Sequence, residues 1–135
     1  MANRRKAREL ALQMLYQVDV NPDVSPADVR VMIREYMTDD HDLQRFAWQL
    51  FVGTQEMRQQ LDTKIEEIAA NWKLSRMAVT DRNILRMACY EMMQVKTPPK
   101  VVVDEAIELA RTFGGENSPA FVNGILDRMM PPATT

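Results

Sequence analysis

The stretch from Val101 to Asp127, VVVDEAIELARTFGGENSPAFVNGILD, decides the fold of this chain. Its apolar residues recur at helical spacing in both halves, so two amphipathic helices are predicted. Three successive valines at the start also suit a β-strand. Asp104 and Glu105 favour the helix, because acidic side chains are stabilised at the positive end of the helix dipole.

The break between these two helices is marked by four residues. Gly114 and Gly115 are predicted to end the first helix in the left-handed conformation, which glycine adopts without a side-chain clash. Ser118 is predicted to cap the second helix, with Pro119 in its first turn. Gly124 lies inside that helix at a cost of roughly 1 kcal/mol relative to alanine. We therefore expect a neighbouring helix to pack closely against it.

Length and composition indicate one ordinary globular domain. The chain has 135 residues, of which 46% are hydrophobic and 27% charged, so we expect a single domain over residues 1–135, frayed at about 131–135. No apolar run approaches the ~18 residues of a membrane span, and no secretion signal begins the chain. The single cysteine, Cys89, excludes an internal disulfide and a multi-cysteine metal site. These features favour a reducing cytoplasm.

Positive charge is concentrated at the start of the chain. Residues 1–10 hold four basic side chains against Glu9, a local charge of +3, whereas the net charge of the whole chain is −2. The rest of the chain therefore carries −5. A basic arm on an acidic body predicts a local surface for anions.

The first helical pattern carries two adjacent stripes. The apolar stripe consists of Ala7, Leu10, Ala11, Met14, Leu15 and Val18. Beside it, Arg5, Arg8, Leu12 and Tyr16 recur at helical steps. Arginine pairs with phosphate and tyrosine stacks on an unpaired base, so this second stripe suits RNA. The alternative is a solvated basic face with Tyr16 half-buried in the core.

Further helices follow at regular intervals. Ser25 is predicted to cap a second helix, and His41 to lie exposed near the start of a third. The apolar pattern from Leu43 to Trp72 predicts one unusually long helix, in which Gly53 could either introduce a bend or let a neighbour approach. Thr80 is predicted to cap the next helix, whose buried face includes Cys89 as a core residue. With about six helices and no convincing strand, an all-α fold is expected.

The sequence contains little that suggests catalysis. We find no phosphate-binding glycine loop, no histidine-based nucleophile pair and no metal-ligand spacing. Asp104, Glu105 and Glu108 are carboxylates on one predicted helix, with Asp104 and Glu108 one turn apart, and they are interpreted as a solvated acidic face. The chain is therefore not expected to be an enzyme, and no cofactor or metal is predicted.

Three blocks of residues resemble the NusB family of bacterial transcription antitermination factors, and they frame nearly the whole chain in the family's order. The first block is Arg5, Ala7–Glu9, Ala11, Gln13, Leu15–Tyr16 and Asp19. The second is Asp81–Arg82, Ile84–Arg86, Ala88 and Tyr90–Glu91. The third is Val101, Val103–Ala106, Glu108–Ala110, Phe113–Gly114, Ser118 and Phe121–Asp127. Residues 20–70 match only in helical pattern.

The resemblance implies an all-α fold of six to seven helices in two packed subbundles. It also implies binding of the single-stranded boxA element of ribosomal RNA leaders, as a heterodimer with NusE, a small-subunit ribosomal protein. That pair joins RNA polymerase and the other Nus factors and suppresses premature termination. Whether the free protein is a monomer or a homodimer stays open.

Carried onto this chain, the resemblance implies two sets of site residues. The RNA-binding set is Arg4, Arg5, Arg8, Tyr16, Lys100, Asn117, Ser118 and Phe121. The NusE surface would involve the helix beginning at Asp81, whose acid suits a basic partner. Many relatives have an acid where this chain has Asn117. We expect the lost negative charge to raise RNA affinity, so Asn117→Asp should weaken boxA binding in low salt.

Two other functions were weighed. A related helical domain begins some ribosomal RNA cytosine methyltransferases, but such an enzyme needs a further cofactor-binding domain, and this chain stops at Thr135. The second alternative is a protein adaptor that uses its apolar helix edges and binds no RNA. In that case, replacing Arg5 and Arg8 together by alanine would leave RNA affinity unchanged.

Overall fold

Seven α-helices make up most of residues 2–130, the part of the chain that the computed structural model describes. They are α1 (Ala2–Val20), α2 (Pro26–Tyr36), α3 (His41–Glu56), α4 (Arg58–Ile68), α5 (Val79–Tyr90), α6 (Pro99–Phe113) and α7 (Ser118–Met129). A 3-10 helix, η1 (Leu74–Arg76), precedes α5, and a π-helix, η2 (Glu91–Val95), extends it. Residues 2–130 contain no strand, which confirms the all-α prediction. The expected frayed tail at 131–135 lies outside the described residues.

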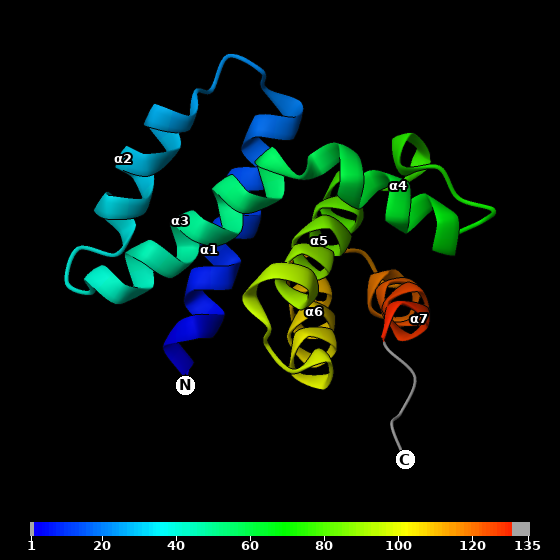
Figure 1. Ribbon diagram of the computed structural model, residues 1–135. Coiled ribbons are helices and arrows are strands. Elements are labelled where there is room, and N and C mark those ends of the chain that lie inside the picture. Colours follow the sequence, from blue (N-terminus) through cyan, green and yellow to red (C-terminus); the bar gives the residue numbers. More distant parts are fainter. Residues whose placement is uncertain (1, 131–135) are drawn as a thin grey trace.

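The helices form two groups that share α5 (Figure 1). The first group consists of α1, α2 and α3, and the second of α4, α5, α6 and α7; α5 also packs on α1 and α3. All residues from Asn83 to Tyr90 of α5 are buried. One cluster of buried apolar side chains runs through both groups, so we propose that the chain is a single domain. None of the described helices is both long and apolar enough to cross a membrane.

Several local predictions are confirmed. The three valines from Val101 to Val103 are helical, inside α6. Ser25 caps α2 through a capping box, in which its hydroxyl accepts from the Asp28 amide and the Asp28 carboxylate accepts from the Ser25 amide. His41 is the exposed first residue of α3. Cys89 is buried, and burial raises the pKa of its thiol to about 11, so it stays protonated at neutral pH.

Two predicted caps are wrong. Thr80 is the second residue of α5, whose N-cap is Ala78 without a side-chain hydrogen bond. Ser118 is the first residue of α7, after the N-cap Asn117. The Ser118 hydroxyl accepts a hydrogen bond from the backbone amide of Gly115 at 2.9 Å, so it stabilises the turn before the helix instead of the helix start.

No described glycine has a left-handed backbone, so the prediction for Gly114 and Gly115 is wrong. Gly114 ends α6 in an extended conformation, with φ at −92°. A Cβ atom there would lie 2.5 Å from the Cβ of Ser118, so the approach of α7 explains the glycine. At Gly124 the expected close packing is wrong: the residue is exposed, and an added Cβ would meet nothing within 4 Å.

The long helix predicted from Leu43 to Trp72 is two helices. The chain leaves helical geometry at Met57, which has φ −97° and ψ 8° and joins α3 to α4. Gly53 does not bend the pattern but admits the ring of Tyr90, which would lie 2.1 Å from an added Cβ. The break lets α3 pack in the first group and α4 in the second.

Candidate nucleic-acid interface

The start of α1 presents exposed cations. Arg4, Arg5 and Lys6 are all exposed. The Arg4 guanidinium lies over the Phe46 ring of α3, 4.3 Å from its centroid, which holds the side chain against the surface. The start of α1 is therefore positively charged and exposed, and packing orients its Arg4 side chain.

Arg5 forms an ion pair that solvent can reach. It donates to both carboxylate oxygens of Glu105 in α6, over 3.1 and 2.9 Å, and half of its own side chain is exposed. The hydrogen bond from Arg5 lowers the pKa of Glu105, and Glu105 raises the pKa of Arg5. Glu105 also lies 3.8 Å from Arg8, so it keeps a cation when Arg5 turns away.

Arg8 does not share the exposed stripe with Arg5 and Tyr16, which corrects the expectation from sequence. Its side chain is only 6% exposed, and it donates to both oxygens of the Glu91 carboxylate over 3.0 and 2.5 Å. Glu91 is itself 2% exposed at the first position of η2. This buried pair joins α1 to the end of α5, so Arg8 holds the scaffold and is not available to a phosphate.

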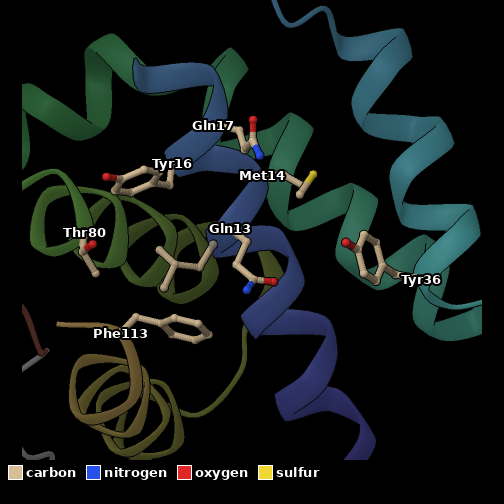
Figure 2. A pocket seen from close by; sticks show the side chains of 8 residues that line it. Gln13, Met14, Tyr16, Gln17, Tyr36, Thr80 and Phe113 are labelled. Carbon is tan, nitrogen blue, oxygen red and sulfur yellow. The ribbon is translucent and has the colours of Figure 1, made fainter. Parts of the chain in front are cut away.

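An open groove of about 440 Å³ follows the exposed cations along α1 (Figure 2). Its lining is Leu12, Gln13, Met14, Tyr16 and Gln17 of α1, Tyr36 of α2, Thr80 of α5 and Phe113 of α6. Figure 2 shows Tyr16, Thr80 and Phe113 on one side of α1 and Tyr36 on the other. Tyr16 is 42% exposed and Tyr36 is 74% exposed. Aromatic faces and amide groups thus converge on one concave surface.

Of the eight groove residues, only Tyr16 belongs to the RNA-binding set predicted from sequence. Gln13 and Gln17 flank Tyr16 on the exposed side of α1, and their spacing of one turn could have identified them. Tyr36 ends α2 and is largely exposed. Phe113 of α6 is only partly buried. No local signal distinguishes these last two from ordinary core aromatics.

The remaining predicted RNA contacts lie at two other places. Lys100 is exposed at the start of α6, 3.8 Å from Asp104. Asn117 is exposed and Ser118 is buried, so only the first of these neighbours can reach a ligand with its side chain. Phe121 packs edge-to-face on Trp72 at 5.4 Å, in a separate depression between the end of α4 and α7. The structure therefore does not bring Phe121 into the groove with Tyr16.

Asp81, the predicted partner contact, is less accessible than expected. It is the third residue of α5 and only 9% exposed. Its buried Oδ1 has no hydrogen-bond partner among the residues that the structure describes. The adjacent Thr80 lines the groove, so the predicted partner surface and the predicted RNA surface meet at the start of α5.

Metal binding has no support in this part of the chain. Among the described residues there is no group of three or more histidine, cysteine, aspartate or glutamate side chains placed to hold an ion. The site is thus built from guanidinium, amide and aromatic groups, which recognise ligands by ion pairing, hydrogen bonding and stacking.

Two bacterial proteins are similar in sequence to this chain over almost its whole length. "Transcription antitermination protein NusB" of Trichlorobacter lovleyi is 46% identical over 130 residues, which cover 96% of this chain and 91% of that protein. The protein of the same name from Anaeromyxobacter dehalogenans is 40% identical over 135 residues, covering 98% and 95%.

Solved NusB structures are also similar to this chain. T. maritima NusB is 36% identical, with a TM-score of 0.83 over 93% of this chain and 89% of that one. A chain of the crystal structure of antitermination factors NusB and NusE in complex with dsRNA is 24% identical, and its TM-score of 0.83 over 94% and 95% concerns the fold alone. A model described as "NusB family" matches residues 5–131. The chain therefore belongs to the NusB family.

Proposed function

We propose that this protein is a transcription antitermination factor that acts by binding and not by catalysis. In this proposal it binds single-stranded boxA RNA of ribosomal RNA leaders as a heterodimer with NusE, and joins RNA polymerase and the other Nus factors in the cytoplasm. One observation carries the proposal: the exposed arginines of α1 continue along the same helix into a groove of aromatic and amide side chains.

Arg4, Arg5, Lys6 and Lys100 are the cations that would meet the phosphates. All four are exposed, so pairing with phosphate does not require desolvation of a buried charge. A phosphate can replace Glu105 as the partner of Arg5, because Arg8 remains 3.8 Å from that carboxylate. The buried Arg8 thus supports the exchange without touching the RNA.

The groove would supply the sequence preference. Bases of an unpaired strand can stack on the exposed rings of Tyr16 and Tyr36, since stacking needs only an accessible aromatic face. The amides of Gln13 and Gln17 both donate and accept hydrogen bonds, so they can read base edges. The side chains on the groove wall therefore match an RNA strand with splayed bases.

NusE would bind beside this groove, near Thr80 and Asp81. Their helix start meets the groove wall, so a partner placed there would share the RNA with α1. The unpaired oxygen of Asp81 needs a donor, which a basic ribosomal protein can provide if the local packing opens.

The test is the affinity for a labelled boxA-type RNA, measured with and without purified NusE, with a scrambled RNA as the control. We expect NusE to tighten binding to boxA but not to the scrambled strand. Absence of binding to both RNAs at low salt with NusE present would leave the fold assigned and the function refuted.

A further inference from the structure

A second basic surface lies on α2 and α3, outside the groove. It is a small cleft of about 80 Å³ lined by Arg30, Ile33 and Arg34 of α2 and Gln44, Arg45 and Trp48 of α3. We call it the α2–α3 cleft. Three of its six lining residues are arginines and none is acidic, so its lining is strongly positive in a chain whose net charge is −2.

Two of these arginines have no carboxylate partner. Arg30 and Arg34 are exposed, and neither lies within 4 Å of an acidic oxygen among the described residues. Arg45 pairs only with Asp42 on its own helix, and both of those side chains are largely exposed. Exposed pairs of this kind exchange readily with another anion.

Packing orients one guanidinium for stacking. Arg30 lies over the Trp48 ring at 5.2 Å, and Trp48 in turn packs on Phe51 with ring centroids 5.8 Å apart. A guanidinium held against one aromatic ring leaves its other face available, and such a face stacks on a nucleic-acid base. Arg34 and Arg45 then lie in the same cleft, where they can pair with the adjoining phosphates.

The cleft and the basic start of α1 both border α3. Arg4 lies over Phe46, and the neighbouring positions 45 and 48 of α3 line the cleft. Exposed arginines therefore run from α1 across α3 to α2. A strand bound at α1 can extend onto the cleft along these arginines.

From this arrangement we propose that the α2–α3 cleft binds an unpaired nucleotide that flanks the RNA segment held by α1 and its groove. This inference rests on the proposed RNA-binding function. The cleft would add affinity through charge and stacking, without strong preference for a particular base.

The test compares three RNAs, each measured with NusE: a boxA-type core, and the same core extended by uridines at its 5′ or its 3′ end. We expect one extension to tighten binding of the unaltered protein by about fivefold or more, as one stacked base would. The double variant Arg30→Ala/Arg34→Ala should lose this gain and keep its affinity for the core. Lys73→Ala/Arg76→Ala removes the same charge from exposed positions near η1 and should retain the gain.

Three outcomes would overturn the inference while leaving the proposed function intact. The extensions could add nothing to the unaltered protein, the double variant could keep the gain, or a polyglutamate peptide could displace the extension as well as polyuridine does, which would assign the cleft to an acidic protein. Failure of the unaltered protein to bind the core would instead refute the proposed function, and this inference with it.

A spectroscopic measurement places the nucleotide directly. The chain has two tryptophans, so Trp72→Phe leaves Trp48 as the only one and keeps an aromatic ring beside Phe121. We expect the emission of Trp48 to change when the extended RNA binds, but not when the core binds. Identical spectra with both RNAs would contradict stacking at the cleft.

Discussion

Ion pairs join both the start and the end of α1 to the second helix group, but the signs of the two partners are reversed between the ends. At the start, α1 supplies the arginines, and η2 and α6 supply the acids Glu91 and Glu105. At the end, α1 supplies the acid Asp19, and α5 supplies Arg82 and Arg86. Both sets of charges on α1 are unfavourable to its dipole, because the arginines lie at the positive end and Asp19 lies at the negative end. The helix has no acid in its first turn and no base in its last. Each charged end therefore depends on a tertiary partner.

The two ends differ in how their charges are shared. The buried Glu91 has one cationic partner among the described residues, Arg8. Asp19, by contrast, accepts hydrogen bonds from Arg82, Asn83 and Arg86 over 2.7 to 3.2 Å. The end of α1 is thus a closed network, whereas its start combines one buried pair with exposed cations. This difference explains why only the start is suited to bind an anion.

Arg8→Ala should produce the largest change in stability. It leaves Glu91 buried without a cation, a loss that costs about 3–5 kcal/mol of the free energy of unfolding. Urea unfolding of the variant and the unaltered protein measures it. Arg5→Ala is the matched control, because Arg5 is exposed and its removal should leave the unfolding midpoint nearly unchanged. Equal losses in the two variants would contradict the distinction between the buried and the exposed arginine.

Asp19→Asn should cost less, about 1–3 kcal/mol, because charged hydrogen bonds are weakened but the network keeps other members. Arg86 still donates to Asp62 at 2.7 and 3.1 Å, so it is not left unpaired. Urea unfolding of Asp19→Asn and of the unaltered protein measures this loss. A loss greater than that of Arg8→Ala would show that the network does not share its charges as the geometry indicates.

The stability that Asp19 provides should depend on pH. Burial opposes ionisation of Asp19, but the hydrogen bonds from Arg82 and Asn83 and the arginine charges outweigh it and lower the pKa to about 2. The unfolded value is about 3.9, so this contribution is complete above pH ~4 and is lost as the pH falls toward 2. The difference in unfolding free energy between the unaltered protein and Asp19→Asn should therefore shrink between pH 5 and pH 2.5. A constant difference would argue against a lowered pKa.

Gly124→Ala, in α7, should change stability least, and it alters neither end of α1. Since an added Cβ meets nothing within 4 Å, the variant should gain up to about 1 kcal/mol from helix propensity. Thermal unfolding measures the gain. A marked loss of stability would mean that a neighbour packs on Gly124 after all, as the sequence had suggested.

The sequence predicted those features that depend on neighbouring residues. The cap at Ser25 and the helical spacing of Val101–Val103 are local, and both are found. Thr80 and Ser118 were assigned as caps by the same local rule, and there the rule failed. Ser118 instead bonds the amide of Gly115, a choice that depends on how α6 and α7 meet.

The site could be predicted only in part, because burial depends on distant partners. Arg5 and Arg8 look alike in sequence, one helical turn apart on a basic arm. Their difference comes from Glu91, which lies 83 residues after Arg8 in the chain and faces it only in the folded protein. Likewise, Tyr36 lines the same groove as side chains of α1, although it lies in another helix, and no periodicity in the sequence reveals this.

The central claim is that the exposed start of α1 binds RNA phosphates while the buried Arg8 holds the fold. Its most direct test is the salt dependence of boxA affinity, in the presence of NusE, for the unaltered protein and for Arg4→Ala/Arg5→Ala. Two lost phosphate contacts should reduce the slope of log affinity against log salt by about 1.4 for a single strand. Lys73→Ala/Arg76→Ala should leave the slope unchanged. Equal slopes for all three proteins would contradict the claim.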